Sequence, residues 1–160
     1  NAESYRDLVR GLSGRVPGMA VGADVMVGFP GEGDDEFRNT LDLIESLPIT
    51  HLHVFSYSPR PGTPASSMPE QVPENRKKER NALLRTLGMK KNFAFRRSLV
   101  GDVLPVVVES NRKSDKGEYT GTSDNYLRVI ISGAKGTDIG KILTVRITSV
   151  EDQRTEGIIL

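Results

Sequence analysis

A glycine-rich turn is the first place in this sequence where residue types and spacing could support chemistry. A nearly continuous apolar run over residues 20–29, interrupted by Asp24, leads into Gly28-Phe29-Pro30-Gly31-Glu32. Glycines in such a turn let a ligand approach the backbone, and a helix that follows offers unpaired N–H groups. The Lys-Ser/Thr pair of a phosphate-binding loop is missing. The turn is therefore a candidate ligand site, with a plain structural turn as the alternative.

Glu32 follows the apolar run, at the end of the predicted strand where parallel barrels place their active sites. Its carboxylate could accept hydrogen bonds from a ligand amine, or it could cap the N–H groups of Gly33 and Asp34. The sequence contains no Ser-His-Asp order and no credible pair of a general acid and a general base. We therefore predict no catalytic residue from the residue types alone.

Composition restricts the metal and redox chemistry that this chain can perform. The 160 residues include no cysteine and only two histidines, so disulfides, thiolate zinc sites and cysteine-held clusters cannot form from them. His51 and His53 share one face of a predicted strand, with Leu52 and Val54 on the other face. Because no third ligand is near, the pattern favours hydrogen-bonded histidines over a metal site. We predict no metal site, and a reducing, cytoplasmic setting.

The net charge of +1 conceals a strongly basic block. Residues 76–97 carry nine Lys or Arg against the single acid Glu79, whereas residues 1–75 carry five against eleven acids. Such a block predicts contact with a polyanion, and a solvated helix face is the alternative. No apolar run approaches the roughly 20 residues that cross a bilayer, so we expect no membrane contact.

Helical and strand patterns alternate in the first part of the chain. The spacing of apolar residues predicts helices over 3–16 and 34–47 and strands over 20–29 and 50–58, the first strand buried on both faces. This order is typical of a parallel α/β sheet or barrel. Prolines at positions 59, 61, 64, 69 and 73 predict a long loop that carries function. A basic helix over 74–97 follows, weakened or kinked at Gly88.

After residue 98 the pattern changes to alternation. Strands are predicted over 103–109, 126–132, 143–148 and 157–160, with Pro105 placing the first at an edge or a bulge. Short strands without a helix predict a small antiparallel β-barrel, with the domain boundary between residues 97 and 98. Its basic residues and few aromatics favour contacts to phosphates and sugars over a series of stacked bases. A plain barrel with scattered surface charge is the alternative.

Several stretches of the sequence resemble one known family. GADVMVGFPGEGDDEF followed by HLHVFSYSPRPGTPA looks like the last two strands of the radical S-adenosylmethionine barrel in methylthiotransferases. LVGDVLPVVVE, GEYTGTSDNYLRV and IGKILTVRI resemble the TRAM domain that ends those proteins. The matches cover nearly the whole chain in the family's order. The resemblance implies the C-terminal part of an α/β (βα) barrel over residues 3–97, followed by an OB-like TRAM barrel over 98–160.

The resemblance also implies cofactors and a site. Enzymes of this family use S-adenosylmethionine and two 4Fe-4S clusters held by cysteines to start sulfur insertion at an adenine carbon. Because this chain has no cysteine, we expect it to be part of a longer enzyme, to hold no cofactor and to be inactive alone. By resemblance, the S-adenosylmethionine pocket is lined by Gly28, Phe29, Pro30, Gly31 and Glu32. The substrate cavity is bordered by Tyr57, Ser58, Pro59, Arg60, Pro61, Gly62, Thr63 and Pro64.

The partner implied by the resemblance is tRNA, at its anticodon arm. The form of LHVFSYSPRPGTPA favours the branch that methylthiolates threonylcarbamoyl-adenosine beside the anticodon. A ribosomal-protein methylthiotransferase and a non-catalytic RNA-binding TRAM module are the alternatives. A cut parallel sheet exposes a strand edge, which predicts a homodimer or a swapped assembly. The residues expected to contact RNA are Lys90, Lys91, Arg96, Arg97, Arg112, Lys113, Tyr126 and Arg128.

Overall fold

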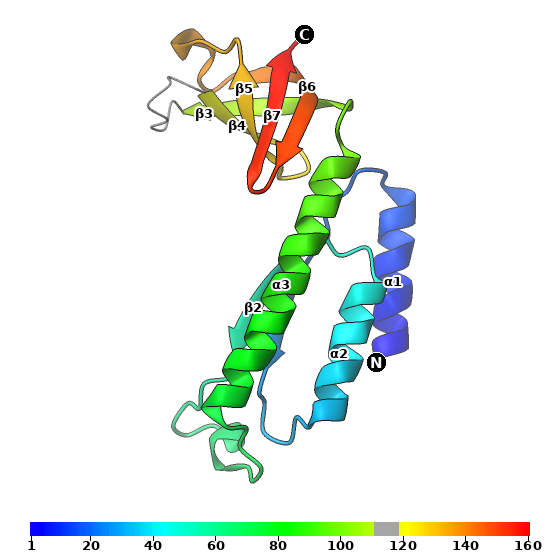
Figure 1. The fold of residues 1–160 in the computed structure, drawn as a ribbon, viewed down its shortest axis with the longest axis vertical. Helices are drawn as coiled ribbons and strands as arrows, with labels where there is room; N and C mark the ends of the chain where they lie inside the picture. The colour runs from blue at the N-terminus through cyan, green and yellow to red at the C-terminus, as the bar shows by residue number, and fades with distance from the viewer. Residues whose placement is uncertain (111–118) are drawn as a thin grey trace. The chain divides into compact units, whose positions relative to one another are not determined.

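A computed structural model describes residues 1–110 and 119–160 of the chain. The chain packs into two compact units, residues 1–91 and 92–160. The long helix α3 (Glu74–Ser98) contains the division between them (Figure 1), six residues before the boundary predicted from the sequence. The candidate RNA-contacting residues Arg112 and Lys113 lie outside the described residues.

The first unit contains a two-stranded parallel sheet. Strands β1 (Gly22–Val27) and β2 (His51–Ser56) pair from Gly22 with His51 to Val27 with Ser56. Helix α1 (Ala2–Arg15) precedes the sheet, α2 (Asp34–Ser46) connects its strands, and a short 3-10 helix η1 (Pro64–Ser67) lies in the loop after β2. The helices and strands predicted for this part of the chain are confirmed, with ends displaced by a few residues.

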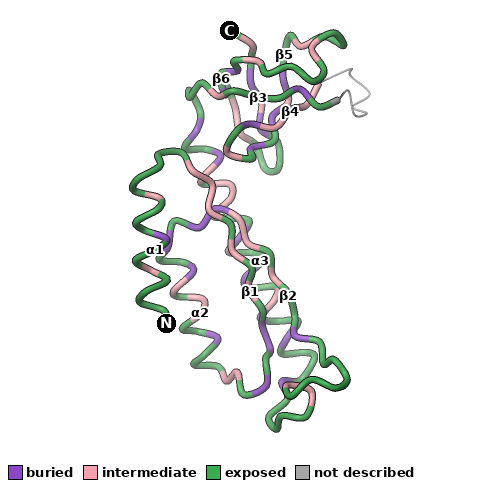
Figure 2. The backbone as a smooth tube through the Cα atoms, turned by 180° about the vertical axis from the view of Figure 1, so that it is seen from behind, coloured by how far each residue is buried: buried purple, intermediate pink, exposed green. Residues whose placement is uncertain are grey.

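The core of the first unit lies on one face of this sheet. Val27 is buried with Val9 of α1, Phe37 and Ile44 of α2 and Leu84 of α3, and alternate residues of both strands pack against them. On the opposite face of the sheet, the Met26 and Phe55 residues are 54% and 53% exposed. Figure 2 shows the two strands from behind. The prediction that β1 is buried on both faces is therefore wrong for the described residues, because no described element covers its second face.

The outer edges of β1 and β2 are unpaired among the described residues. Each strand forms its ladder only with the other one. Free N–H and C=O groups along such edges can pair with a second chain. The homodimer or swapped assembly stays a prediction.

Helix α3 continues through Gly88 as one helix, so the weakening or kink predicted there does not end it. Gly88 is buried against β2, and a Cβ at this position would lie 3.1 Å from Cβ of Leu52. The missing side chain lets the helix approach the strand closely. The cost of a helical glycine is thus offset by packing in the first unit.

The second unit is a closed barrel of five strands in the order β3-β4-β5-β7-β6. Its pairs are antiparallel except for β5 with β7, which is parallel, so the wholly antiparallel barrel that we predicted is corrected at that ladder. Five strands closed in this way make an OB-like barrel. The strands are β3 (Val103–Ser110), β4 (Tyr119–Ser123), β5 (Arg128–Ser132), β6 (Ile142–Glu151) and β7 (Arg154–Ile159), with a 3-10 helix η2 (Gly136–Asp138) before β6.

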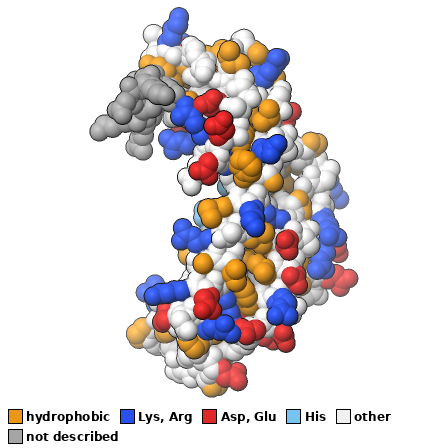
Figure 3. Space-filling model, in the orientation of Figure 1, with side chains coloured by type: hydrophobic (Ala, Val, Ile, Leu, Met, Phe, Trp, Pro, Cys, Tyr) orange, Lys and Arg blue, Asp and Glu red, His pale blue; other side chains and the backbone are white. Residues whose placement is uncertain are grey.

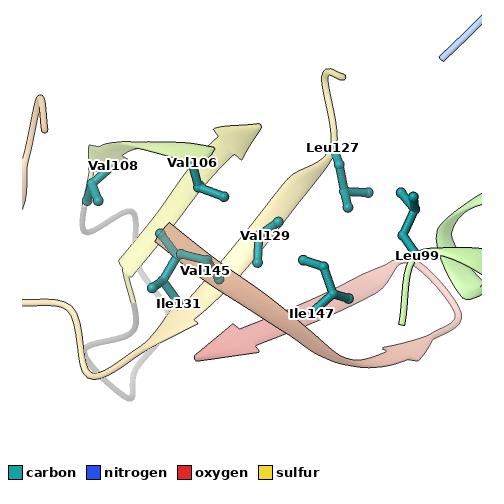
Figure 4. Close-up of a cluster of buried hydrophobic side chains, with 8 residues drawn as sticks. All are labelled: Leu99, Val106, Val108, Leu127, Val129, Ile131, Val145 and Ile147. Carbon is teal, nitrogen blue, oxygen red and sulfur yellow. The ribbon is translucent and has the colours of Figure 1, made fainter. Parts of the chain in front are cut away.

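Alternate residues of the strands fill this barrel. Val106, Val129 and Val145 are fully buried and point toward one another (Figure 4). Gly121 and Gly157 stand within strands because neighbouring backbone comes close to them. A Cβ at Gly121 would lie 2.4 Å from the carbonyl oxygen of Val107. The ladder between β3 and β4 starts only at Val106, but Pro105 pairs with Thr144 of β6 in the closed barrel, and the bulge of β3 lies between Val108 and Ser110. The prediction that Pro105 marks an edge or a bulge is therefore wrong.

Candidate functional site

The turn after β1 and the proline-rich loop after β2 meet at the carboxyl ends of the two strands. The Tyr57 N–H donates to the Val27 carbonyl at 2.8 Å, and the Phe29 and Tyr57 rings meet edge to face with centroids 5.3 Å apart. The Gly31 N–H donates to the Glu70 carbonyl at 3.0 Å. Parallel strands place their carboxyl ends side by side, where ligands usually bind. The structure therefore brings the candidate cofactor residues and the candidate substrate loop together.

The two glycines of this turn have different surroundings. Gly28 and Gly31 have φ angles of +76° and +83°, a region that side chains rarely adopt. A Cβ on Gly28 would lie 2.4 Å from Cγ of Lys77, whereas at Gly31 the nearest atom would be a Glu70 carboxylate oxygen at 3.7 Å. The space over Gly28 is thus filled by Lys77, and the space at Gly31 is open to a ligand.

Lys77 is a site residue that the sequence interpretation missed. It is 3% exposed, its Nζ lies 2.7 Å from a Glu74 carboxylate oxygen, and the same Nζ stands 5.5 Å from the Tyr57 ring centre. The aliphatic stem covers the turn and the cation covers the aromatic ring. Lys77 therefore helps to fix both predicted segments in place.

Arg80 is the second missed residue, and it holds Glu32. Its guanidinium lies 2.6 Å from the Glu32 carboxylate and donates to the Glu32 carbonyl at 2.8 Å. The other Glu32 carboxylate oxygen accepts from the Gly28 N–H at 3.0 Å. Glu32 thus closes the turn upon itself. The alternative that Glu32 caps the Gly33 N–H is wrong, because the Gly33 N–H donates to Glu36 instead.

Asp34 extends this ion-pair network to the exposed start of α2. It contacts Arg80 at 2.9 Å and Arg76 at 2.8 Å. Burial pulls the pKa of Arg80 down, but hydrogen bonds to Asp34 and Glu32 outweigh it and raise that pKa. The hydrogen bond from Arg80 and the charge of Arg76 hold the pKa of Asp34 below its usual range. Two carboxylates and two arginines therefore join the turn, α2 and α3.

The lowered pKa of Asp34 predicts a pH-dependent contribution to stability. A depressed carboxyl pKa stabilises the fold above the unfolded pKa, and the contribution is lost as pH falls through the folded pKa. We expect Asp34→Asn to lower the urea midpoint at neutral pH, and the difference from wild type to shrink below about pH 4. The matched control is Asp35→Asn, since the described residues give Asp35 no ion pair. A difference that persists unchanged at pH 2 would contradict this prediction.

The loop over residues 57–64 presents a buried tyrosine and an exposed polar turn. Tyr57 is 8% exposed, and its hydroxyl has no hydrogen-bond partner among the described residues. Residues 58–64 are exposed. The Thr63 N–H and hydroxyl both bond to the Arg60 carbonyl, at 3.2 and 2.8 Å, and Gly62 has a φ of +82°. The candidate substrate residues thus form an ordered turn that offers Arg60 to solvent.

The histidines lie where the predicted strand placed them. His53 is exposed on the uncovered face of the sheet, and Nδ1 of His51 lies 2.8 Å from the Thr50 hydroxyl. Leu52 and Val54 pack against the core on the other face, as predicted. Within residues 1–110 and 119–160, no cluster of three or more His, Cys, Asp or Glu could hold a metal ion.

The candidate RNA-contacting residues of α3 divide into two kinds. Lys90 and Arg97 are exposed. Nζ of Lys91 donates to the Glu45 carbonyl at 2.9 Å, and the burial of Lys91 lowers its pKa. Arg96 is 8% exposed and donates to Asn92 and to the carbonyls of Asp152 and Arg154. Lys91 and Arg96 are thus used by the fold, and Arg96 cannot face an external ligand without giving up these bonds.

Basic side chains do not form one stripe on the visible surface. In Figure 3, Lys and Arg are interleaved with acidic and apolar side chains over α3. The exposed face of the helix also carries Leu83 at 54% and Met89 at 60%. In the barrel, the candidates Tyr126 and Arg128 are both exposed. On the face that Figure 3 shows, the basic block therefore does not form one continuous basic stripe.

Comparison with known proteins shows what this chain is similar to. Residues 97–160 match the TRAM domain. The chain is 38% identical over 157 residues to a "tRNA-2-methylthio-N(6)-dimethylallyladenosine synthase" of Pelotomaculum thermopropionicum, covering 98% of the chain and 35% of the relative. Homologues that are tRNA methylthiotransferases thus match nearly the whole of this chain. The chain spans about a third of the length of the curated relatives that it matches.

Relatives with different printed substrates are equally similar to the chain. A "Threonylcarbamoyladenosine tRNA methylthiotransferase MtaB" of Bacillus subtilis is 38% identical over 157 residues, which are 97% of the chain and 35% of that protein. A "tRNA-2-methylthio-N(6)-dimethylallyladenosine synthase" of Rickettsia rickettsii is 35% identical over 158 residues, which are 99% of the chain and 35% of that protein. The similarity therefore does not distinguish between the two modified bases. None of the described helices combines the length and apolarity that a membrane span requires.

The family implies S-adenosylmethionine, and the residues present can be tested against it. The Phe29 ring is 43% exposed, and the backbone at Gly31 is open, which suits a flat, largely apolar ligand such as an adenine. The carboxylate of Glu32 is turned inward to Arg80 and the Gly28 N–H. The turn therefore fits the cofactor through Phe29 and Gly31, while Glu32 supports the turn.

Proposed function

We propose that this chain is the C-terminal part of a radical S-adenosylmethionine tRNA methylthiotransferase. The observation that carries the proposal is the meeting of the 28–32 turn with the 57–64 loop at the carboxyl ends of two parallel strands. The sheet face that bears exposed Met26 and Phe55 is the face that would line the inside of a (βα) barrel. On this proposal, residues 3–97 complete that barrel and residues 98–160 are the TRAM domain.

Each segment has a separate task in the proposed enzyme. Phe29 and Gly31 contact the cofactor, while Gly28 packs against Lys77 and Glu32 binds Arg80. Pro30 is buried within the turn. When bound, S-adenosylmethionine supplies the group that removes hydrogen from the substrate adenine and the methyl group of the product. The exposed 57–64 loop borders the modified base and excludes water from it. The two 4Fe-4S clusters need cysteines that this chain lacks, so the chain alone is inactive.

The substrate that we propose is a threonylcarbamoyl-adenosine next to the anticodon. Two observations support it: the loop form SPRPGTPA, and Arg60, an exposed cation in that loop that could meet the carboxylate of a threonylcarbamoyl group. The equal similarity to synthases named for dimethylallyladenosine makes that base the direct competitor. A ribosomal-protein substrate and a non-catalytic TRAM module remain the alternatives.

The coding sequence upstream of Glu3 provides the first test. Cysteine triplets upstream would support the enzyme, whereas an open reading frame that begins at this point would contradict it. The longer protein, with reconstituted clusters, is then given tRNA bearing threonylcarbamoyladenosine, tRNA bearing dimethylallyladenosine, or the ribosomal protein. We expect a methylthio product on the first tRNA. A product on the second tRNA alone would move the substrate proposal to the dimethylallyl base.

The RNA-contacting set that we propose is smaller than the predicted one, and Arg112 and Lys113, which lie outside the described residues, stay predictions. We propose that Lys90, Arg97, Tyr126 and Arg128 contact the anticodon arm of tRNA in the cytoplasm. Arg96 is left out of the contacts because its bonds to Asp152 and Arg154 hold the end of α3 against the barrel of the second unit. Lys91 is left out because it donates to Glu45.

The salt dependence of tRNA binding tests this set. Each lost phosphate contact reduces the slope of log affinity against log salt by about 0.7 to 0.9, so Lys90→Gln with Arg97→Gln should lower it by about 1.5. The control replaces Arg10 and Arg15, two exposed arginines of α1, and should leave the slope unchanged. Fluorescence titrations at several salt concentrations give both slopes. Equal slopes for wild type and the double variant would mean that the basic helix is only a solvated face.

A further inference from the structure

Tyr126 combines high exposure with an unfavourable backbone conformation. Its side chain is 82% exposed, the highest value among the large hydrophobic side chains of the described residues. Its φ is +61°, in the left-handed region that bulky side chains rarely adopt. Such strain persists only where the surrounding structure enforces it, and it concentrates at functional positions. A solvent-facing aromatic ring gains nothing for the fold from this arrangement.

A network around buried Ser123 enforces the conformation. The Ser123 hydroxyl accepts from the Leu127 N–H at 2.9 Å and lies 2.6 Å from Oδ1 of Asn125. The Tyr126 N–H donates to the Ser123 carbonyl and the Ser123 N–H to the Leu127 carbonyl, each at 3.0 Å. Leu127 is itself anchored in the barrel core at 3% exposure. The turn between β4 and β5 is therefore closed on both sides of Tyr126, and its ring is held outward.

We propose that Tyr126 is a preorganised stacking platform for one unstacked base of the RNA, with Arg128 contacting the adjacent phosphate. The inference rests on the proposed tRNA-binding function and names the residue that holds a base within it. Single-stranded RNA is recognised by stacking splayed bases on aromatic rings. Because the turn is already fixed, little backbone freedom is lost when the base binds. A single platform holds one base and is tolerant of its identity.

Arg128, two residues after Tyr126 in the sequence, is the cation that we assign to the adjacent phosphate. Leu127 and Val129 are buried in the core, so Arg128 between them lies on the outer surface of β5. Arg128 also lines a groove of about 500 Å³ with Thr120, Ile130 and the turn over residues 151–155. A groove of this size can receive a nucleotide. Two arginines and two acidic residues line it, Arg128 and Arg154 with Glu151 and Asp152, and Arg154 is ion-paired with Glu156 at 2.6 Å. Such a mixed lining suits base edges and one phosphate better than a run of phosphates.

The test compares variants that separate stacking from strain. Tyr126→Phe keeps the ring, whereas Tyr126→Asn removes it and places at this position a residue that tolerates left-handed backbone. Affinity for an anticodon stem-loop RNA should be retained by Tyr126→Phe and fall about tenfold in Tyr126→Asn. The thermal midpoint of Tyr126→Asn should equal or exceed that of wild type, because the strain is relieved. A 2-aminopurine placed in the loop should be quenched by wild type and Tyr126→Phe only.

Salt dependence distinguishes the two residues. Tyr126→Asn should weaken binding equally at all salt concentrations, whereas Arg128→Gln should also reduce the salt slope by about one. If wild type binds the stem-loop and Tyr126→Asn binds equally well, the stacking assignment is overturned and the proposed function stands. If wild type binds no RNA, both are overturned. If Tyr126→Asn has a lower thermal midpoint than wild type, and Tyr126→Phe loses RNA affinity in proportion, Tyr126 stabilises the fold instead of stacking on a base.

Discussion

Replacing Gly121 with alanine is expected to unfold the barrel of residues 92–160. A Cβ at this position would lie 2.4 Å from the carbonyl oxygen of Val107 and 2.6 Å from Cγ1 of Val106. A backbone carbonyl cannot rotate away as a side chain can, so β3 and β4 would have to separate. Overpacking of this kind costs about 1–3 kcal/mol even where side chains can move. We expect a loss of about 3 kcal/mol or more, together with loss of tRNA binding.

Hydrogen exchange of the barrel amides measures the effect. In Gly121→Ala, the amides of β3 and β4 should exchange at rates close to those of an unfolded chain. The control is Gly22→Ala in β1, where no heavy atom stands within 4 Å of the added Cβ and φ is not positive. Slow exchange of the Val108 amide in Gly121→Ala would show that the barrel adjusts, against this prediction.

Gly121 also shows why one strand could not be predicted. Gly121, Thr122 and Ser123 precede Asp124 and Asn125, and such residues are typical of turns. Their place in β4 is decided by tertiary structure, because the close approach of Val107 admits only glycine. Local pattern carries no signal for a contact between residues 14 positions apart in the chain. The strands with alternating valines and isoleucines, by contrast, were predicted correctly.

The first unit shows a similar division between what pattern predicts and what packing decides. The meeting of the 28–32 turn and the 57–64 loop follows from the rule that parallel strands end at the same edge. Lys77 and Arg80 were missed because a basic helix is usually interpreted as a solvated one. The partner of Arg80 lies far away in sequence, since Glu32 is 48 positions before it. The sequence signal that could have found them is helical spacing. Lys77 and Arg80 share one helix face with Leu84 and Gly88, which are buried.

Replacing Arg80 with methionine is expected to loosen the 28–32 turn and to destabilise the first unit strongly. The Arg80 and Glu32 side chains are only 7% and 15% exposed, so removal of the cation leaves a carboxylate with little access to water. Breaking a buried ion pair in this way costs about 3–5 kcal/mol. The guanidinium also stands 5.3 Å from the Phe37 ring centre, a contact that methionine replaces only through its stem.

The second substitution Glu32→Gln tests the cause of this loss. An amide removes the buried charge and still offers an oxygen to the Gly28 N–H, so the double variant should recover a large part of the urea midpoint lost by Arg80→Met. Circular dichroism follows the helices, and exchange of the Gly28 amide follows the turn directly. Arg85→Met, at an exposed position of the same helix, is the matched control. It should change neither the urea midpoint nor the exchange of the Gly28 amide. If Arg80→Met lowers the midpoint no more than Arg85→Met does, solvent reaches Glu32 freely, and the turn that we assign to the cofactor is held by its glycines alone.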